Sequence, residues 1–167
     1  LIFKPLIILT SIFLILYWKN NYNILKKLNE KLKKTYKKIL FFGFLSAFFL
    51  FLHAVFLGIQ FENDFYKLFR RVVIILFIIF EVTAQILLTK SLYVNQNYLK
   101  DLIEMVFIKI KIAFNVLIFF ITMYAFFVLV FLNPSTEFKN ILEWNYFVFL
   151  LLYYVLSFLL WNKKKPR

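Results

Sequence analysis

The chain has 167 residues, of which 63% are hydrophobic and 23% aromatic, and its formal net charge is +13. Soluble domains are roughly 45–50% apolar, so this composition, with a mean hydropathy of +0.81, predicts an integral membrane protein. The absence of Cys and the single His exclude disulfides, Fe–S clusters, Cys nucleophiles and metal or haem sites built from several His residues of one chain.

The basic residues lie mostly in the gaps between apolar runs. Anionic lipid headgroups therefore explain the net charge better than nucleic acid does. The chain is rich in Phe, Tyr, Ile, Asn and Lys and poor in Gly, Ala, Arg and Pro. This bias indicates an AT-rich coding genome, which favours a mitochondrial inner membrane or a bacterial plasma membrane as the location.

The first apolar run covers residues 1–18. It ends in Tyr17, Trp18 and Lys19, a combination typical of an anchor at the membrane interface. A cleaved signal peptide would instead end in small residues, so we expect a retained membrane span.

Residues 19–38 carry eight Lys residues and one acid, Glu30. Apolar side chains recur every three or four residues from Tyr22 to Tyr36, which predicts a basic amphipathic helix lying at the interface, with a solvated linker as the alternative. The side chains expected to bind lipid headgroups are Lys26, Lys27, Lys31, Lys33, Lys34, Lys37 and Lys38.

Four further apolar runs cover residues 39–60, 69–90, 112–132 and 142–161. Together with the first run they predict an all-α integral membrane protein, a bundle of about five transmembrane helices in a single polytopic domain over residues 1–167. We expect a helix to start near residue 102 and lead into the fourth span, with Val106 and Ile110 on an apolar face opposite Lys109 and Lys111.

Five spans place the termini on opposite sides of the membrane. If the 19–38 segment is inside, sixteen of the 21 Lys and Arg residues fall on that side, Lys111 among them, and five fall outside. The positive-inside rule therefore predicts an outer N-terminus and an inner C-terminus.

Glu81 is the carboxylate near the middle of the third apolar run. In a helix, Gln85 and Thr89 share its face, and the depths of the other spans predict two polar layers. One joins Glu81 to Ser46 and His53. The other joins Gln85 to Asn115 and Ser157.

A carboxyl group at bilayer depth is normally kept only with a partner. Glu81 is either a protonated structural donor between helices, or a group that loads and releases a proton or cation with His53 as relay. A third alternative is a cation supplied by a partner subunit.

No catalytic motif, metal site or cofactor site emerges. Phe residues surround the second span on all sides and few small residues permit close helix packing, which favours a peripheral packing subunit. We therefore expect a non-enzymatic accessory or assembly subunit of a larger membrane complex, such as a respiratory one, whose partners are lipids and other membrane subunits. The alternatives are a proton- or cation-coupled transport component centred on Glu81 and a membrane-embedded enzyme.

Overall fold

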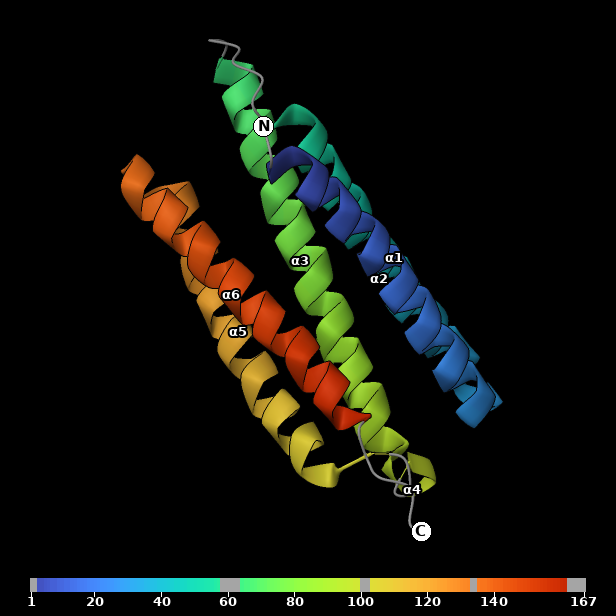
Figure 1. Ribbon diagram of the computed structural model, residues 1–167. Helices are drawn as coiled ribbons and strands as arrows, with labels where there is room; N and C mark the ends of the chain where they lie inside the picture. The colour runs from blue at the N-terminus through green and yellow to red at the C-terminus, as the bar shows by residue number, and fades with distance from the viewer. Residues whose placement is uncertain (1–2, 58–63, 100–102, 133–134, 162–167) are drawn as a thin grey trace. The chain divides into compact units, whose positions relative to one another are not determined.

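The computed structural model describes residues 3–57, 64–99, 103–132 and 135–161, and every regular element within them is a helix (Figure 1). The all-α prediction is thus confirmed for these residues. The elements in chain order are α1 (Phe3–Leu28), the short 3-10 helix η1 (Glu30–Leu32), α2 (Lys33–Phe56), α3 (Asp64–Val94), α4 (Gln96–Leu99), α5 (Met105–Phe131) and α6 (Thr136–Leu160).

Three helices are long and apolar enough to cross a membrane. Their spanning segments are Lys33–Phe56 in α2, Leu68–Val94 in α3 and Met105–Val128 in α5. In α6 the apolar segment is shorter, Trp144–Leu160, and α1 is not among the three. The structure thus supports membrane-length helices in the second, third and fourth predicted spans, while the spans at residues 1–18 and 142–161 stay predictions.

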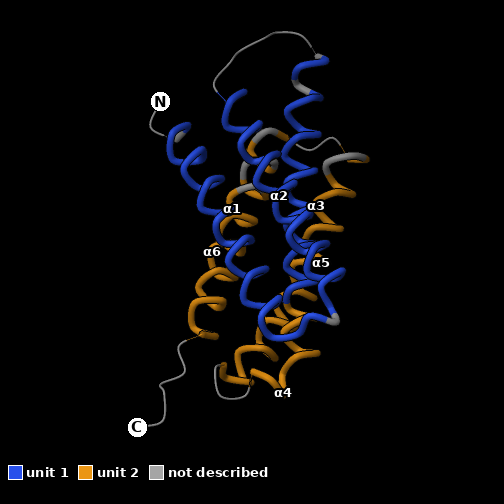
Figure 2. The backbone as a smooth tube through the Cα atoms, turned by 90° about the vertical axis from the view of Figure 1, so that its right-hand side faces the viewer, with its two compact units in different colours: residues 1–88 blue, residues 89–167 orange. Residues whose placement is uncertain are grey.

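The chain divides into two compact units, residues 1–88 and residues 89–167, and the boundary falls within α3 (Figure 2). Unit 1 holds α1, η1, α2 and most of α3. Unit 2 holds the last turns of α3 together with α4, α5 and α6.

The predicted interfacial helix over residues 19–38 is wrong. No residue breaks the helix at the end of the first apolar run, so α1 continues through Trp18 to Leu28, the chain turns in η1, and α2 begins at Lys33. The basic segment is therefore the closed end of a helical hairpin. Within its apolar stripe Leu25 and Tyr36 are buried, and the helices α1 and α2 that carry them pack along each other.

Close packing within the hairpin depends on Gly43 of α2. Trp18, predicted as an interfacial anchor, is fully buried instead, and a Cβ atom at residue 43 would overlap its indole ring. The predicted ring of Phe around this span is also wrong, because α2 has two different faces. The small residues lie on its buried face, which comprises Tyr36, Ile39, Gly43, Ser46, Ala47, Leu50 and Ala54.

Aromatic rings join α2 to α3 within unit 1. Phe80 stacks on Phe42 and on Phe49, with ring centroids 6.0 and 5.5 Å apart. Nearer the end of α2, the ring of Phe56 meets Phe69 edge-on at 5.2 Å. These contacts fix the register of the two helices and so decide which polar side chains meet between them.

In unit 2, α5 and α6 lie side by side, with Phe114 and Phe149 in contact at 5.8 Å (Figure 1). The chain enters α6 at Ser135, whose hydroxyl accepts a hydrogen bond from the backbone N–H of Phe138 at 3.3 Å. This side-chain cap satisfies one of the free donors of the first helical turn and fixes where α6 begins.

Candidate functional site

The first buried polar group, which we call the Glu81 cluster, consists of Ser46, Glu81 and Gln85 in unit 1. All three side chains are fully buried. Ser46 Oγ of α2 lies 2.6 Å from Glu81 Oε2 of α3, and Gln85 Nε2, one turn further along α3, donates to Glu81 Oε1 at 2.9 Å. The structure thus brings together three of the five predicted site residues.

Hydrogen-bond directions within this cluster accommodate two protonation states of Glu81. Ser46 Oγ also lies 2.8 Å from the Gly43 carbonyl oxygen, yet the hydroxyl has one proton for these two acceptors. When that proton points to Gly43, Ser46 accepts a bond from a protonated Glu81, and when Glu81 is ionised, Ser46 donates to it. The cluster can therefore hold Glu81 either protonated or ionised.

His53, the predicted relay, is not joined to Glu81 by any hydrogen bond found among the described residues. It follows Ser46 by two turns of α2, about 10 Å along the helix axis. Its Nδ1 atom is buried and has no hydrogen-bond partner in the described part of the chain, and Arg70 lies within electrostatic range of its ring. His53 therefore belongs to the end of α2 and not to the Glu81 cluster.

The second buried polar group, the Lys111 cluster, consists of Thr89, Lys111, Asn115, Tyr153 and Ser157 in unit 2. The side chain of Lys111 is 0% exposed. Its Nζ donates to Ser157 Oγ at 2.5 Å and lies 4.0 Å from the centroid of the Tyr153 ring, a cation–π distance. Ser157 in turn donates to the Tyr153 carbonyl oxygen at 2.9 Å.

Asn115, another predicted site residue, belongs to the Lys111 cluster. Its Nδ2 donates to Thr89 Oγ1 at 2.8 Å, and the Thr89 hydroxyl lies 3.1 Å from the Tyr153 hydroxyl. The described bonds of Asn115 and Ser157 therefore lie within unit 2. A layer that also contains Gln85 would join the two units and stays a prediction.

Lys111 is the functional candidate that the sequence interpretation missed. That interpretation placed it on a polar face opposite Val106 and Ile110, but Lys111 is buried whereas those two apolar residues are 64% and 42% exposed. The fourth span also starts earlier than predicted, at Met105. The signal was present in the spacing of the buried face of α5, which is Ile108, Lys111, Asn115 and Ile118.

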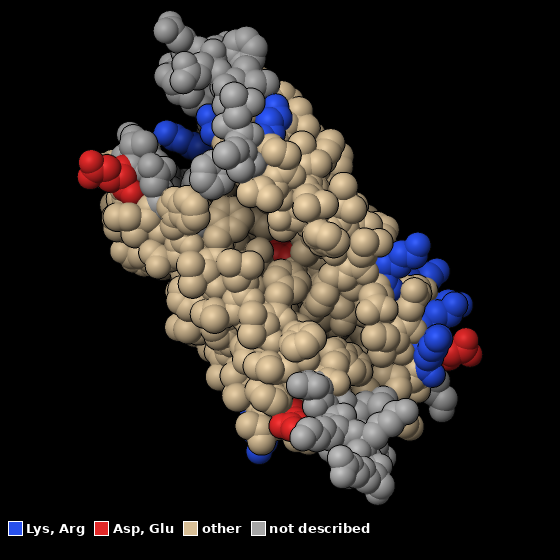
Figure 3. Space-filling model, in the orientation of Figure 1, with Lys and Arg blue, Asp and Glu red and all other residues tan. Residues whose placement is uncertain are grey.

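The predicted headgroup-binding lysines gather at the closed end of the α1–α2 hairpin, where they form a basic patch (Figure 3). Lys26 and Lys27 belong to the last turn of α1, where a cation suits the negative end of the helix dipole. Lys33, Lys34, Lys37 and Lys38 are exposed on the first turns of α2, whereas the side chain of Lys31 lies outside the described part.

The start of α2 concentrates positive charge. Its first turn contains no acid, and its N-cap residue, Leu32, provides no side-chain hydrogen bond. Exposed lysines therefore coincide with the positive end of the helix dipole, which makes this end attractive to anions.

No protein-family model, curated protein or solved structure matches this chain. The fold and the two clusters define the class: an all-helical protein with three membrane-length helices and buried ionisable groups on two of them, α3 and α5.

Proposed function

We propose that this chain is a non-enzymatic accessory or assembly subunit of a larger membrane protein complex. The supporting observation is the outer face of α5, which presents large apolar side chains around most of the helix. Those exposed by at least 37% are Val106, Ile110, Ile112, Val116, Leu117, Phe119, Phe120, Met123, Tyr124, Phe126, Phe127 and Phe131.

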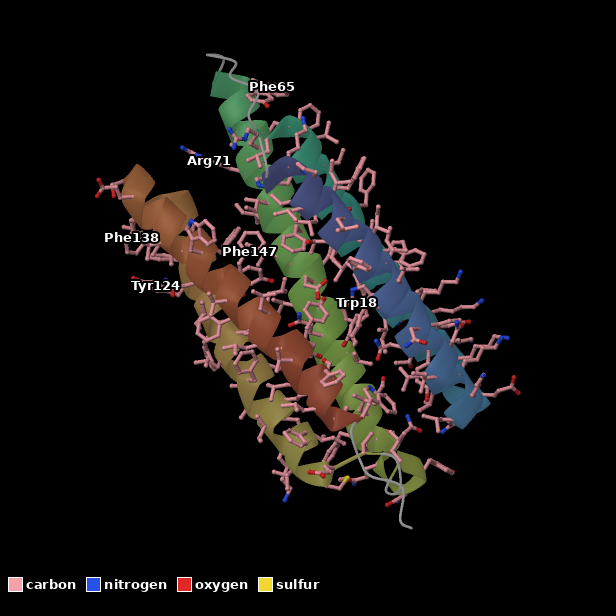
Figure 4. All side chains as sticks on the ribbon, in the orientation of Figure 1. Trp18, Phe65, Arg71, Tyr124, Phe138 and Phe147 are labelled. Carbon is pink, nitrogen blue, oxygen red and sulfur yellow. The ribbon has the colours of Figure 1, made fainter. Side chains whose placement is uncertain are left out.

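The exposed hydroxyl of Tyr124 indicates that neighbouring helices, and not lipid alone, contact this face. It is 58% exposed and points away from α5 (Figure 4). It lies seven residues before the end of the helix, about 10 Å along its axis. Lipid tails offer no acceptor for a hydroxyl at that depth, whereas a partner helix does.

Photo-crosslinking in native membranes tests this proposal. A benzophenone amino acid at Phe120 or Tyr124 is expected to capture other polypeptides, whereas the same probe at Phe77, which is fully buried, captures only this chain. Stable companions should also co-purify in mild detergent, and Tyr124→Phe should weaken that association. Crosslinks to lipid alone, together with a free monomer in detergent, would contradict the proposal.

The proposed subunit crosses the membrane five times, with its N-terminus outside and its C-terminus inside, in a mitochondrial inner membrane or a bacterial plasma membrane. The sixteen-to-five distribution of Lys and Arg supports this orientation, and the burial of Lys111 in α5 reduces the inner count by only one. Because the chain has no Cys, single-cysteine labelling at residues 67 and 164 reports on sidedness directly. Labelling of both positions from one side contradicts five spans.

The basic patch at the hairpin end is proposed to bind anionic headgroups of the inner leaflet. Each basic residue near the surface contributes about 1 kcal/mol at low salt, so simultaneous Lys→Gln changes at residues 33, 34, 37 and 38 should reduce retention of anionic lipid. Added salt should weaken the wild-type interaction in the same way. If neither the substitutions nor added salt reduces lipid retention, the segment is a solvated turn that does not bind lipid.

The second candidate is a proton- or cation-coupled transport component centred on Glu81, and the two protonation states that the Glu81 cluster accommodates favour it. In proteoliposomes under a pH gradient, such a protein gives flux that Glu81→Gln abolishes without unfolding the chain. Normal assembly of that variant combined with lost flux would replace the first proposal by this one.

A further inference from the structure

The end of unit 1 where α2 stops and α3 begins carries two unpartnered nitrogen atoms. His53 Nδ1, in the last turn of α2, and Arg70 Nε, in the second turn of α3, are both buried and have no hydrogen-bond partner in the described part of the chain. The two side chains lie within electrostatic range of each other.

A hydrogen bond and a ring contact join α2 to α3 at this end. The Tyr66 hydroxyl of α3 donates to the Phe56 carbonyl oxygen of α2 at 2.7 Å, beside the edge-on contact of Phe56 with Phe69. A third basic side chain arrives from α1, because Lys4 Nζ donates to the Val55 carbonyl oxygen at 2.9 Å. Lys4, His53 and Arg70 thus come from three helices to the end of α2, and we call them the basic end cluster.

An unpartnered buried donor is costly. A buried donor without a hydrogen-bond partner costs about 1–3 kcal/mol, and more if the donor is charged. Native proteins satisfy roughly 90% or more of such groups. Here two orphaned nitrogens from basic side chains occur together, within a cluster that concentrates positive charge. Arg70 Nε–H can only donate a hydrogen bond, and the cluster concentrates positive charge, so an acceptor that carries negative charge complements this end better than a neutral one does. A guanidinium group selects planar or tetrahedral oxyanions.

The position along α2 identifies the oxyanion. His53 lies nineteen residues after Lys34 of the basic patch, about 28 Å along the helix axis. The hydrocarbon core of a bilayer is about 30 Å thick, so two basic groups with this separation meet the headgroups of opposite leaflets. The anion present there at high density is the phosphate of a phospholipid.

We propose that Lys4, His53 and Arg70 bind the phosphate group of an anionic phospholipid in the leaflet opposite the basic patch. In this site Arg70 Nε–H and the His53 ring supply directed hydrogen bonds. Lys4, anchored on the last turn of α2, supplies further charge. The site does not depend on whether the chain is an accessory subunit or a transporter.

Arg70 and Arg71 provide a matched pair of variants. They carry the same charge on adjacent residues, but Arg71 is exposed and points away from α3 near its first turns (Figure 4). In detergent titrated with phosphatidylglycerol, native mass spectrometry of the full chain carrying the four Lys→Gln changes of the basic patch should show one retained lipid. Arg70→Gln should weaken that retention at least about tenfold, the loss of one charge-assisted hydrogen bond, whereas Arg71→Gln changes it less than about threefold.

Further arms separate the alternatives. Phosphatidylcholine should be retained much less than phosphatidylglycerol, and inorganic phosphate at millimolar concentration should not displace the lipid. Arg70→Lys, which keeps the charge but removes Nε, tests the geometry if the Gln variant fails to fold, and it should also lose retention. Equal effects at Arg70 and Arg71, equal retention of both lipids, or displacement by free phosphate would each overturn the proposal.

Discussion

The Glu81 cluster and the Lys111 cluster solve the same physical problem in different ways. Glu81 is held by two side chains that each bond one of its carboxyl oxygens, Ser46 from a neighbouring helix and Gln85 from its own. Among the described residues, Lys111 donates to Ser157 and rests its amine on the Tyr153 ring. A π face and one hydroxyl leave a charged amine with part of its hydrogen-bonding capacity unused. Two directed bonds satisfy a carboxyl group more completely.

This difference has a consequence for what each group contributes. Removing Glu81 leaves Gln85 Nε2 without the acceptor described for it, whereas removing Lys111 leaves Ser157 still bonded to the Tyr153 carbonyl oxygen. The Glu81 cluster should therefore specify how the helices pack. The presence of the buried Lys111 should lower the stability of the fold, so a role other than stability should explain why the chain has it. Substitutions at four positions test this contrast.

The largest effect is expected from Gly43→Ala, which attacks the packing beside the Glu81 cluster. The new methyl group would overlap the buried Trp18 ring, and overpacking costs about 1–3 kcal/mol. SDS-induced unfolding followed by circular dichroism measures the loss. The double variant Gly43→Ala with Trp18→Leu should recover part of it, and full stability of the single variant would show that the hairpin packs loosely.

Lys111→Met should stabilise the protein. The change removes an amine whose burial costs at most about 2.5–3.5 kcal/mol, the value for the middle of a span, and loses an interhelical bond of about 0.6–2 kcal/mol. We expect a net gain of roughly 1–2 kcal/mol in the same unfolding assay. Lys109→Met is the matched control, because Lys109 is exposed on the same helix and should change little. If Lys111→Met is less stable than wild type, Lys111 stabilises the fold as Glu81 does, and the contrast between the two clusters fails.

Glu81→Leu should destabilise the protein by about 1 kcal/mol and impair assembly, because it removes both interactions described between Glu81 and its neighbours. Glu81→Gln keeps the shape, a donor for Ser46 and an acceptor for Gln85, so its stability should stay near wild type. Co-purification of companions together with the unfolding midpoint distinguishes these outcomes. Equal loss in both variants would mean that the ionised carboxylate itself is needed.

The smallest effect is expected from Tyr153→Phe, which removes the hydroxyl contact with Thr89 at 3.1 Å but keeps the ring beneath Lys111. Interhelical hydrogen bonds in membranes average about 0.6 kcal/mol, and the loss should be of that size. Tyr124→Phe on the exposed face is the control for unfolding of the isolated chain. A loss several times larger at Tyr153 would show that the polar chain from Asn115 to Tyr153 acts cooperatively.

The interpretation of the sequence was most successful where the signal is local. The long apolar runs at residues 39–60, 69–90 and 112–132 predict membrane-length helices, and α2, α3 and α5 each contain a segment of that length, at Lys33–Phe56, Leu68–Val94 and Met105–Val128. Glu81 was recognisable because a carboxylate in the middle of an apolar run has no route to water. Lys111 escaped because a lysine two turns from a helix end normally extends its long side chain to the interface.

The sequence by itself determined the helical structure, the long apolar helices and Glu81 as a buried polar residue, because each follows from hydropathy and helical period along one stretch of chain. Tertiary structure decided the rest. The close fit of Trp18 against Gly43 accompanies the hairpin that ends in residues 19–38, and the partners of the buried Lys111 lie on α6. Hydropathy measures the affinity of each residue for an apolar solvent, but the buried face of a helix is chosen by the shape and hydrogen-bonding groups of its neighbours.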